Sequence, residues 1–98
     1  MFIFLLLIMK RIVINVYGLV QGVFFRYTTR KVARKLGLTG IVKNMPDGSV
    51  YIEAEGSEEM LSELLKFTKK GPKYAEVSDV EYEYTVPQYK YKGFDYAF

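Results

Sequence analysis

One stretch determines how the rest of the chain is arranged: Val16-Tyr17-Gly18-Leu19-Val20-Gln21-Gly22-Val23-Phe24-Phe25-Arg26. It leaves an apolar run, passes through a loop bracketed by Gly18 and Gly22, and ends at an arginine where a basic helical pattern starts. A helix N-terminus carries unpaired backbone N–H groups and a partial positive charge. Loop amides and the Arg26 guanidinium can therefore converge on one oxyanion. The Gly-x-x-x-Gly spacing alone is weakly specific, and it matches neither a Walker loop nor a Gly-x-Gly-x-x-Gly fingerprint.

The residues before and after this stretch predict a strand and a helix. Ile12, Ile14 and Val16 recur at period two, which indicates a strand over residues 11–17. Beyond the loop, apolar residues fall at helical spacing, and they are Phe25, Thr29, Val32, Ala33 and Leu36. Gly37 is expected to end this helix. Its opposite face carries Arg30, Lys31, Arg34 and Lys35, which we interpret as a solvated surface and not as a nucleic-acid contact.

The second half of the chain predicts a hairpin, a second helix and further strands. Residues 38–44 and 50–55 predict two strands of a β-hairpin, joined by the turn Met45-Pro46-Asp47-Gly48. Ser57 is placed to cap a second helix, which Lys69-Lys70-Gly71-Pro72 ends. Alternation over residues 78–86 predicts a half-exposed strand, and the aromatic tail from Tyr89 to Phe98 predicts a short edge strand. We interpret that tail as packing and not as a surface for base stacking.

The resulting order is strand, helix, strand, strand, helix, strand. This βαββαβ order predicts an α+β protein with the ferredoxin-like split βαβ fold, in which two right-handed crossovers place both helices on one face. We expect an antiparallel sheet of four to five strands. The fold serves enzymes, RNA-binding modules and ligand-binding regulators alike, so function has to be argued from the site.

Composition limits the chemistry that is available. The chain has 98 residues, enough for one domain, and its 14 basic and 11 acidic residues give a net charge of +3. It contains neither cysteine nor histidine, which removes a thiol nucleophile, the usual general base and the commonest metal ligands. Any catalysis must then work by position and charge. Few Asn and Gln among many Lys, Glu and Tyr are compatible with a thermophilic source.

The first nine residues are apolar throughout. They are too few to span a bilayer, which takes roughly 20 residues as a helix, and the charges of Lys10 and Arg11 follow the run instead of preceding it as in a signal peptide. We expect residues 1–9 to be an N-terminal extension, with Met9 an alternative first residue, and residues 10–98 to be the functional domain. The expected protein is cytoplasmic, makes no membrane contact and is a monomer. A dimer formed through the apolar run is the alternative.

Several motifs together resemble one enzyme family. Gly18-Leu19-Val20-Gln21-Gly22-Val23-Phe24-Phe25-Arg26, then Gly40-Ile41-Val42-Lys43-Asn44, then Gly48-Ser49-Val50 and Gly56 are similar to the acylphosphatases, which hydrolyse the carboxyl-phosphate bond. The resemblance covers roughly residues 10 to 98 and includes the order of elements. The sequence departs from the family at Ile41, where an aromatic residue is usual, and at the C-terminus, which lacks the family's closing basic residue.

The resemblance implies a role for each matched residue. Arg26 would be the phosphate-binding arginine, assisted by backbone N–H groups of residues 18–26, which are Gly18, Leu19, Val20, Gln21, Gly22, Val23, Phe24, Phe25 and Arg26 itself. Asn44 would hold the attacking water. The family uses no metal or other cofactor and forms no phosphoenzyme. The implied substrate is a small acyl phosphate, inorganic phosphate is a product, and nucleic acid is not a partner.

Each of these residues also has a plainer interpretation. Arg26 could be a surface arginine, although the helix dipole disfavours a cation in a first turn that has no anion nearby. Asn44 could form the turn before Pro46. Gly18 and Gly22 could serve backbone geometry alone, and Gln21 could support the loop or do nothing. The rival for the whole chain is a non-catalytic module that binds RNA through its sheet or a small anion through the loop.

Overall fold

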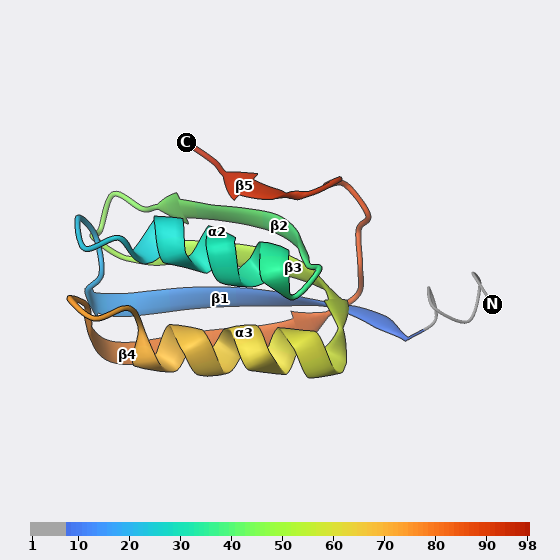
Figure 1. Cartoon of the computed structure of the whole chain (residues 1–98), viewed down its shortest axis with the longest axis horizontal. Coiled ribbons are helices and arrows are strands. Elements are labelled where there is room, and N and C mark those ends of the chain that lie inside the picture. Colours follow the sequence, from blue (N-terminus) through green and yellow to red (C-terminus); the bar gives the residue numbers. More distant parts are fainter. Residues whose placement is uncertain (1–7) are drawn as a thin grey trace.

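The computed structural model describes residues 8–98, so most of the apolar N-terminal run, and any dimer contact made by it, lies outside the described residues. Seven elements follow in order: β1 (Met9–Leu19), α2 (Phe25–Lys35), β2 (Thr39–Asn44), β3 (Val50–Ser57), α3 (Glu58–Lys70), β4 (Glu76–Thr85) and β5 (Phe94–Tyr96). Figure 1 shows the two helices lying side by side along the sheet. The predicted ferredoxin-like order is confirmed, and β1 begins two residues earlier than expected, at Met9.

The sheet has five strands in the order β4-β1-β3-β2-β5. The pairs β1–β3, β1–β4 and β2–β3 are antiparallel, as predicted. The outermost pair is not, because β5 runs parallel to β2, with Gly40 beside Phe94 and Val42 beside Tyr96. The expectation of a purely antiparallel sheet was therefore wrong, and the sheet is mixed.

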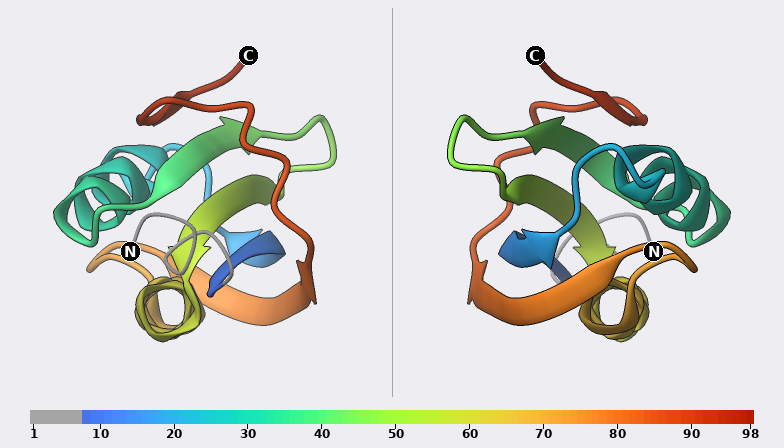
Figure 2. Two further views of the ribbon diagram at one scale, coloured as in Figure 1. Left: turned by 90° about the vertical axis from the view of Figure 1, so that its right-hand side faces the viewer. Right: turned by 90° about the vertical axis from the view of Figure 1, so that its left-hand side faces the viewer.

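The path of the chain after β4 explains the parallel pair. Thr85 of β4 pairs with Arg11 near the start of β1. The last residues of β4 and the first residues of β2 therefore lie at the same end of the strands. Residues 86–93 then cross the face that the helices leave open (Figure 2), and we call them the strap. The strap crosses to the far side of β2 at this same end of the sheet, so β5 starts beside the beginning of β2. The last strand therefore has to run in the direction of β2.

The core lies between the helices and one face of the sheet. Alternate residues of the two central strands point into it and are completely buried, namely Ile12, Ile14, Val16, Val50, Ile52 and Ala54. The helices cover them with Phe25, Thr29 and Ala33 from α2 and with Leu61 and Leu64 from α3. Phe25 also packs on Phe67, with ring centroids 5.9 Å apart, so the first residue of α2 is fixed to α3. Within residues 8–98, neither helix is long and apolar enough to cross a membrane.

The two helices begin in different ways. Ser57 caps α3 as predicted, because its side chain accepts a hydrogen bond from the backbone N–H of Met60, and Glu58 and Glu59 occupy the first turn. At α2 the cap position is Phe24, whose side chain makes no capping hydrogen bond, and the first turn has no acidic residue. The start of α2 therefore has neither a side-chain cap nor an acidic residue in its first turn, whereas the start of α3 has both.

Charged residues are buried on the open face beneath the strap. Arg11 donates to Glu53 over 2.7 Å, and its Nε lies 3.8 Å from a carboxylate oxygen of Glu55. The backbone N–H groups of Gln88 and Tyr89 donate to Glu55 over 2.7 and 3.0 Å, which ties the strap to β3. Burial alone would raise the pKa of Glu53, but hydrogen bonds from Arg11 and Tyr51 hold that pKa below its ordinary value.

We predict that Arg11→Met lowers the free energy of unfolding by about 3 kcal/mol at neutral pH. The substitution removes the buried cation between Glu53 and Glu55, and Glu53 keeps the more distant cation of Lys90, at 3.7 Å. The pKa of Glu53 is lowered on folding, so its contribution is complete above the ordinary carboxyl pKa of about 4.3. It is lost as the pH falls through the lower pKa of the folded state. The difference between parent and variant should therefore shrink below about pH 4. Urea unfolding of both proteins across this pH range measures it.

The matched control is Lys10→Met, which removes the neighbouring cation of β1 from an exposed ion pair with Glu58. This variant should change stability much less than Arg11→Met. Equal losses in the two variants would contradict the account of the buried cluster.

Candidate active site

Three segments meet at one end of the sheet to form a cavity of about 380 Å³. The loop and the start of α2 contribute Val20, Gly22, Phe24, Phe25, Arg26 and Tyr27. The end of β2 contributes Asn44, and the C-terminal segment contributes Tyr96 and Phe98. The crossover topology is responsible for this meeting, because β1, β2 and β5 all run toward the end at which α2 begins (Figure 1).

The loop between β1 and α2 is fixed at both ends. Gly18 lies at an irregularity in the β1–β4 pairing with φ +126°, and a Cβ there would come within 2.1 Å of the carbonyl oxygen of Glu76. Val20 and Phe25 are buried and attach the two sides of the loop to the core. Gly22 has φ +75° and open space around it, so it supplies a backbone conformation and no close packing. The backbone of the loop is therefore held in one shape.

Gln21 joins this loop to the hairpin that follows Asn44. Its Nε2 donates to the carbonyl oxygens of Met45 and Ser49, over 2.8 and 2.9 Å. Met45 and Ser49 flank the β2–β3 turn and are paired by their own backbone hydrogen bond of 2.9 Å. The side chain of Gln21 thereby fixes the distance between the loop and the end of β2.

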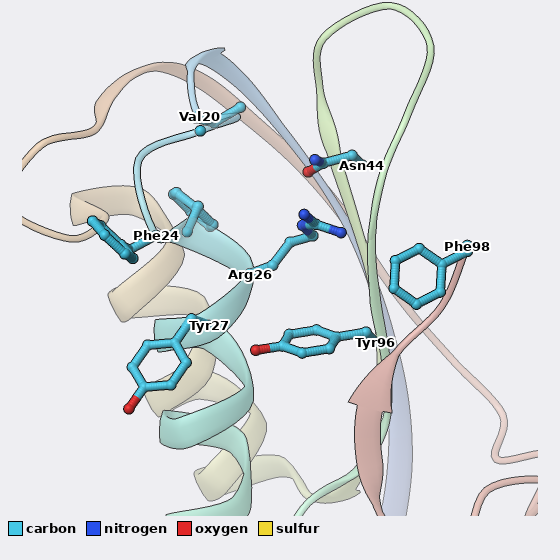
Figure 3. Close-up of a pocket in the computed structure, with 9 residues that line it drawn as sticks. Val20, Phe24, Arg26, Tyr27, Asn44, Tyr96 and Phe98 are labelled. Carbon is cyan, nitrogen blue, oxygen red and sulfur yellow. The ribbon is translucent and has the colours of Figure 1, made fainter.

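Arg26 and Asn44 face one another across the cavity (Figure 3). Arg26 is the second residue of α2, and Asn44 is the last residue of β2, on the same face of that strand as the buried Val42. Three of the four arginines pair with carboxylates, whereas Arg26 has no ion pair among residues 8–98. The Oδ1 atom of Asn44 is buried and has no hydrogen-bond partner within that same range.

The C-terminal segment supports the arginine through aromatic rings. The Cζ atom of Arg26 lies 5.8 Å from the ring centroid of Tyr96 and 5.9 Å from that of Phe98. Tyr96 is itself held against α2, because Arg30 stacks on its ring at 4.1 Å and also pairs with Asp95 over 3.1 Å. Hydrogen bonds from the Tyr96 N–H and from Arg30 hold the pKa of Asp95 below its ordinary value. The arginine thus has two aromatic neighbours, Tyr96 at the end of β5 and Phe98 two residues after it.

The predicted site residues take different places in this arrangement. Val20, Gly22, Phe24, Phe25, Arg26 and Asn44 line the cavity. Gly18 and Leu19 belong to the end of β1, Gln21 supports the hairpin, and Val23 packs against the core. Tyr27, Tyr96 and Phe98 line the cavity without having been predicted to do so. The spacing of Phe24 and Tyr27 in the sequence could have indicated Tyr27. Tyr96 and Phe98 come near Arg26 only because β5 pairs parallel to β2.

Comparison with known proteins identifies the family. The sequence profile of the acylphosphatase family matches residues 12–96. The chain belongs to the acylphosphatase family. The acylphosphatase of Thermotoga maritima is 52% identical over 80 residues, covering 82% of this chain and 89% of that protein. The acylphosphatase of Archaeoglobus fulgidus is 49% identical over 85 residues, covering 87% and 94%.

A solved structure agrees with this assignment. The crystal structure of acylphosphatase from Bacillus subtilis superposes with a TM-score of 0.87 at 35% identity, covering 91% of this chain and 99% of that one. The expected family is therefore confirmed, and the chain is an enzyme of the acylphosphatase type.

We predict that Gln21→Ala loosens the connection between the loop and the β2–β3 turn. Loss of two hydrogen bonds should lower the free energy of unfolding by about 1 to 2 kcal/mol. It should also speed amide hydrogen exchange at Met45, whose N–H closes the turn. Exchange measured by NMR or mass spectrometry tests this. Gln88→Ala is the control, because only the backbone of that exposed residue bonds to Glu55; equal effects in both variants would contradict the role of Gln21.

Proposed function

We propose that the enzyme hydrolyses acyl phosphates to a carboxylate and inorganic phosphate by direct attack of water on phosphorus. Arg26 and backbone N–H groups of residues 18–26 bind the phosphoryl group, and Asn44 holds the water. Residues 10–98 form the catalytic unit, and the apolar run before them is an extension whose last residue, Met9, already belongs to β1. One observation carries the proposal: the unpaired Arg26 guanidinium faces the unpartnered Asn44 oxygen at the uncapped start of α2.

The proposed role of Arg26 rests on its geometry and its charge. A guanidinium presents parallel donors that match two phosphoryl oxygens, and it keeps its proton at any physiological pH. The start of α2 adds N–H groups that no side chain caps. Donors that are fixed before the substrate arrives stabilise the charge of the transition state by about 3 to 4 kcal/mol each.

Asn44 is a poor base, so its proposed role is positional. A buried polar oxygen with no protein partner is the kind of group that binds a water molecule. The Asn44 amide can accept a hydrogen bond from that water and so direct a lone pair of its oxygen at phosphorus. Holding the two reacting atoms in line lowers the barrier without removing a proton first.

Because of the chemistry of the substrate, binding of the phosphoryl group and positioning of the water are sufficient for catalysis. The water oxygen bonds to phosphorus while the bond between phosphorus and the acyl oxygen breaks, and the electron pair of that bond leaves with the carboxylate. A proton of the water passes to a phosphoryl oxygen. Because a carboxylate is a good leaving group, no strong general acid is needed. No step in this scheme is assigned to a metal or to a protein base, and it fits a chain that contains neither histidine nor cysteine.

We predict that the parent protein hydrolyses acetyl phosphate with a chelator present, and that both Arg26→Ala and Asn44→Ala abolish most of this activity. The loss in kcat/KM should be about 100- to 1,000-fold for Arg26→Ala and about 100-fold for Asn44→Ala. Asn44→Ala should act mainly on kcat, because the phosphate donors stay in place. Release of inorganic phosphate measures the rates, and circular dichroism shows whether each variant is folded.

Two matched controls remove a cation and an asparagine elsewhere in the chain. Lys31→Ala removes an exposed cation of α2, and Asn15→Ala removes the other asparagine, which lies on the open face of the sheet. Both variants should retain activity. A parent without turnover that binds RNA with a steep salt dependence, while phosphate has no effect, would favour the rival binding module.

A further inference from the structure

The cavity is larger than a phosphoryl group requires. Its volume of about 380 Å³ lies in the range of pockets that hold organic ligands. Five aromatic residues line it. Phe25 is buried in the core, and the other four are Phe24, Tyr27, Tyr96 and Phe98. A site that bound only the phosphoryl group would have no use for so much aromatic surface next to its guanidinium.

The four rings divide into two pairs with different surroundings. Tyr96 and Phe98 lie against the Arg26 guanidinium, and Tyr96 is fixed further by Arg30. Within residues 8–98, Phe24 and Tyr27 make no ring contact with a cation or with another ring. Their side chains are 68% and 52% exposed. The first pair supports the arginine, and the second pair is free to contact a ligand.

Phe24 is unusual in both its backbone and its exposure. Its φ of +66° is a left-handed conformation that glycine or asparagine adopts at lower cost than an aromatic residue. Its ring gains little from burial in return. Tyr27 follows three residues later, which is the spacing that places side chains on the same side of a helix. Both side chains line the cavity and are exposed, and we call these two rings together the 24/27 surface.

The in-line geometry of phosphoryl transfer places the leaving group on the side of this surface. In phosphoryl transfer the attacking and leaving oxygens lie roughly in line on opposite sides of phosphorus. Asn44 lies on one side of the Arg26 guanidinium, and Phe24 and Tyr27 lie on the other (Figure 3). Water held by Asn44 therefore places the acyl oxygen, and the carbon skeleton attached to it, on the side of the 24/27 surface.

We infer that the 24/27 surface binds the acyl group of the substrate and selects acyl phosphates whose acyl group is a flat aromatic ring over those with a short alkyl group. This inference rests on the proposed function, because the phosphoryl group must first be fixed by Arg26. An aryl acyl group can stack on an exposed ring of this surface, whereas a methyl group offers no face for stacking. The surface therefore sets which acyl phosphate is used and leaves the attack on phosphorus to Arg26 and Asn44.

The test compares benzoyl phosphate with acetyl phosphate as substrates. The ratio of their kcat/KM values is measured for the parent, Tyr27→Ala, Tyr27→Phe and Phe24→Asn, so that the intrinsic reactivity of each substrate cancels between proteins. Tyr27→Ala should lower the ratio of benzoyl to acetyl phosphate about three- to tenfold, and Tyr27→Phe should keep it. Phe24→Asn, which suits the left-handed backbone and removes the ring, should also lower it.

Tyr74→Ala is the matched control, because Tyr74 is 64% exposed and lies outside the cavity lining. It should leave the ratio unchanged. A ratio that stays within about twofold of the parent in Tyr27→Ala and in Phe24→Asn would overturn the inference, since stacking contributes more than that. If Arg26→Ala loses both activities while the ratio is unchanged in the ring variants, the proposed function is supported and the inference about the 24/27 surface is wrong.

A binding measurement separates the two proposals if the parent shows no turnover. Benzylphosphonate and methylphosphonate carry the same anionic group on an aryl or a methyl substituent. Calorimetry should find tighter binding of benzylphosphonate to the parent, and Tyr27→Ala should remove that advantage. Equal dissociation constants for the two phosphonates in the parent would overturn the inference whether or not the protein is catalytic.

Discussion

The unpaired guanidinium of Arg26 is the constraint on which the rest of the site depends. Arg11, Arg30 and Arg34 each meet a carboxylate, and Arg26 meets none among residues 8–98. Its position at the positive end of α2, where the first turn contains no acidic residue, adds to the local positive charge. Val20 and Phe25 are buried and attach both ends of the loop to the core. The proposed phosphoryl ligand would supply the negative charge that this end of α2 lacks in its first turn.

The topology brings the second half of the site to this cation. The crossovers place the ends of β1 and β2 beside the start of α2, so Asn44 faces Arg26 although 18 residues of sequence separate them. Gln21 then fixes the gap with two hydrogen bonds to the β2–β3 turn. The strap, tied to Glu55, carries the chain across the open face and delivers Tyr96 next to the same guanidinium. Elements that are distant in the sequence thus share one small volume.

Local patterns in the sequence were enough to predict the elements, and they proposed the two polar residues that the structure brings together at one cavity. Period-two alternation located β1 and β3, Ser57 marked the start of α3, and the matched motifs singled out Arg26 and Asn44. The parallel pairing of β5 was not predicted, because the direction of a short edge strand depends on the path of the strap and on buried contacts such as those of Glu55. The proximity of Tyr96 and Phe98 to Arg26 follows from that pairing, so it was not predicted either. Long-range contacts of this kind leave no periodic signal in the residues that make them.

The central claim is that water attacks phosphorus and a carboxylate departs, so that position and charge suffice in a chain without histidine or cysteine. Hydrolysis of an acyl phosphate in water enriched in oxygen-18 tests it most directly, because the label shows which bond breaks. The account predicts one labelled oxygen in the inorganic phosphate and none in the carboxylate, detected by mass spectrometry of both products. Label in the carboxylate would mean attack on the carbonyl carbon, which would contradict the roles given to Arg26 and Asn44.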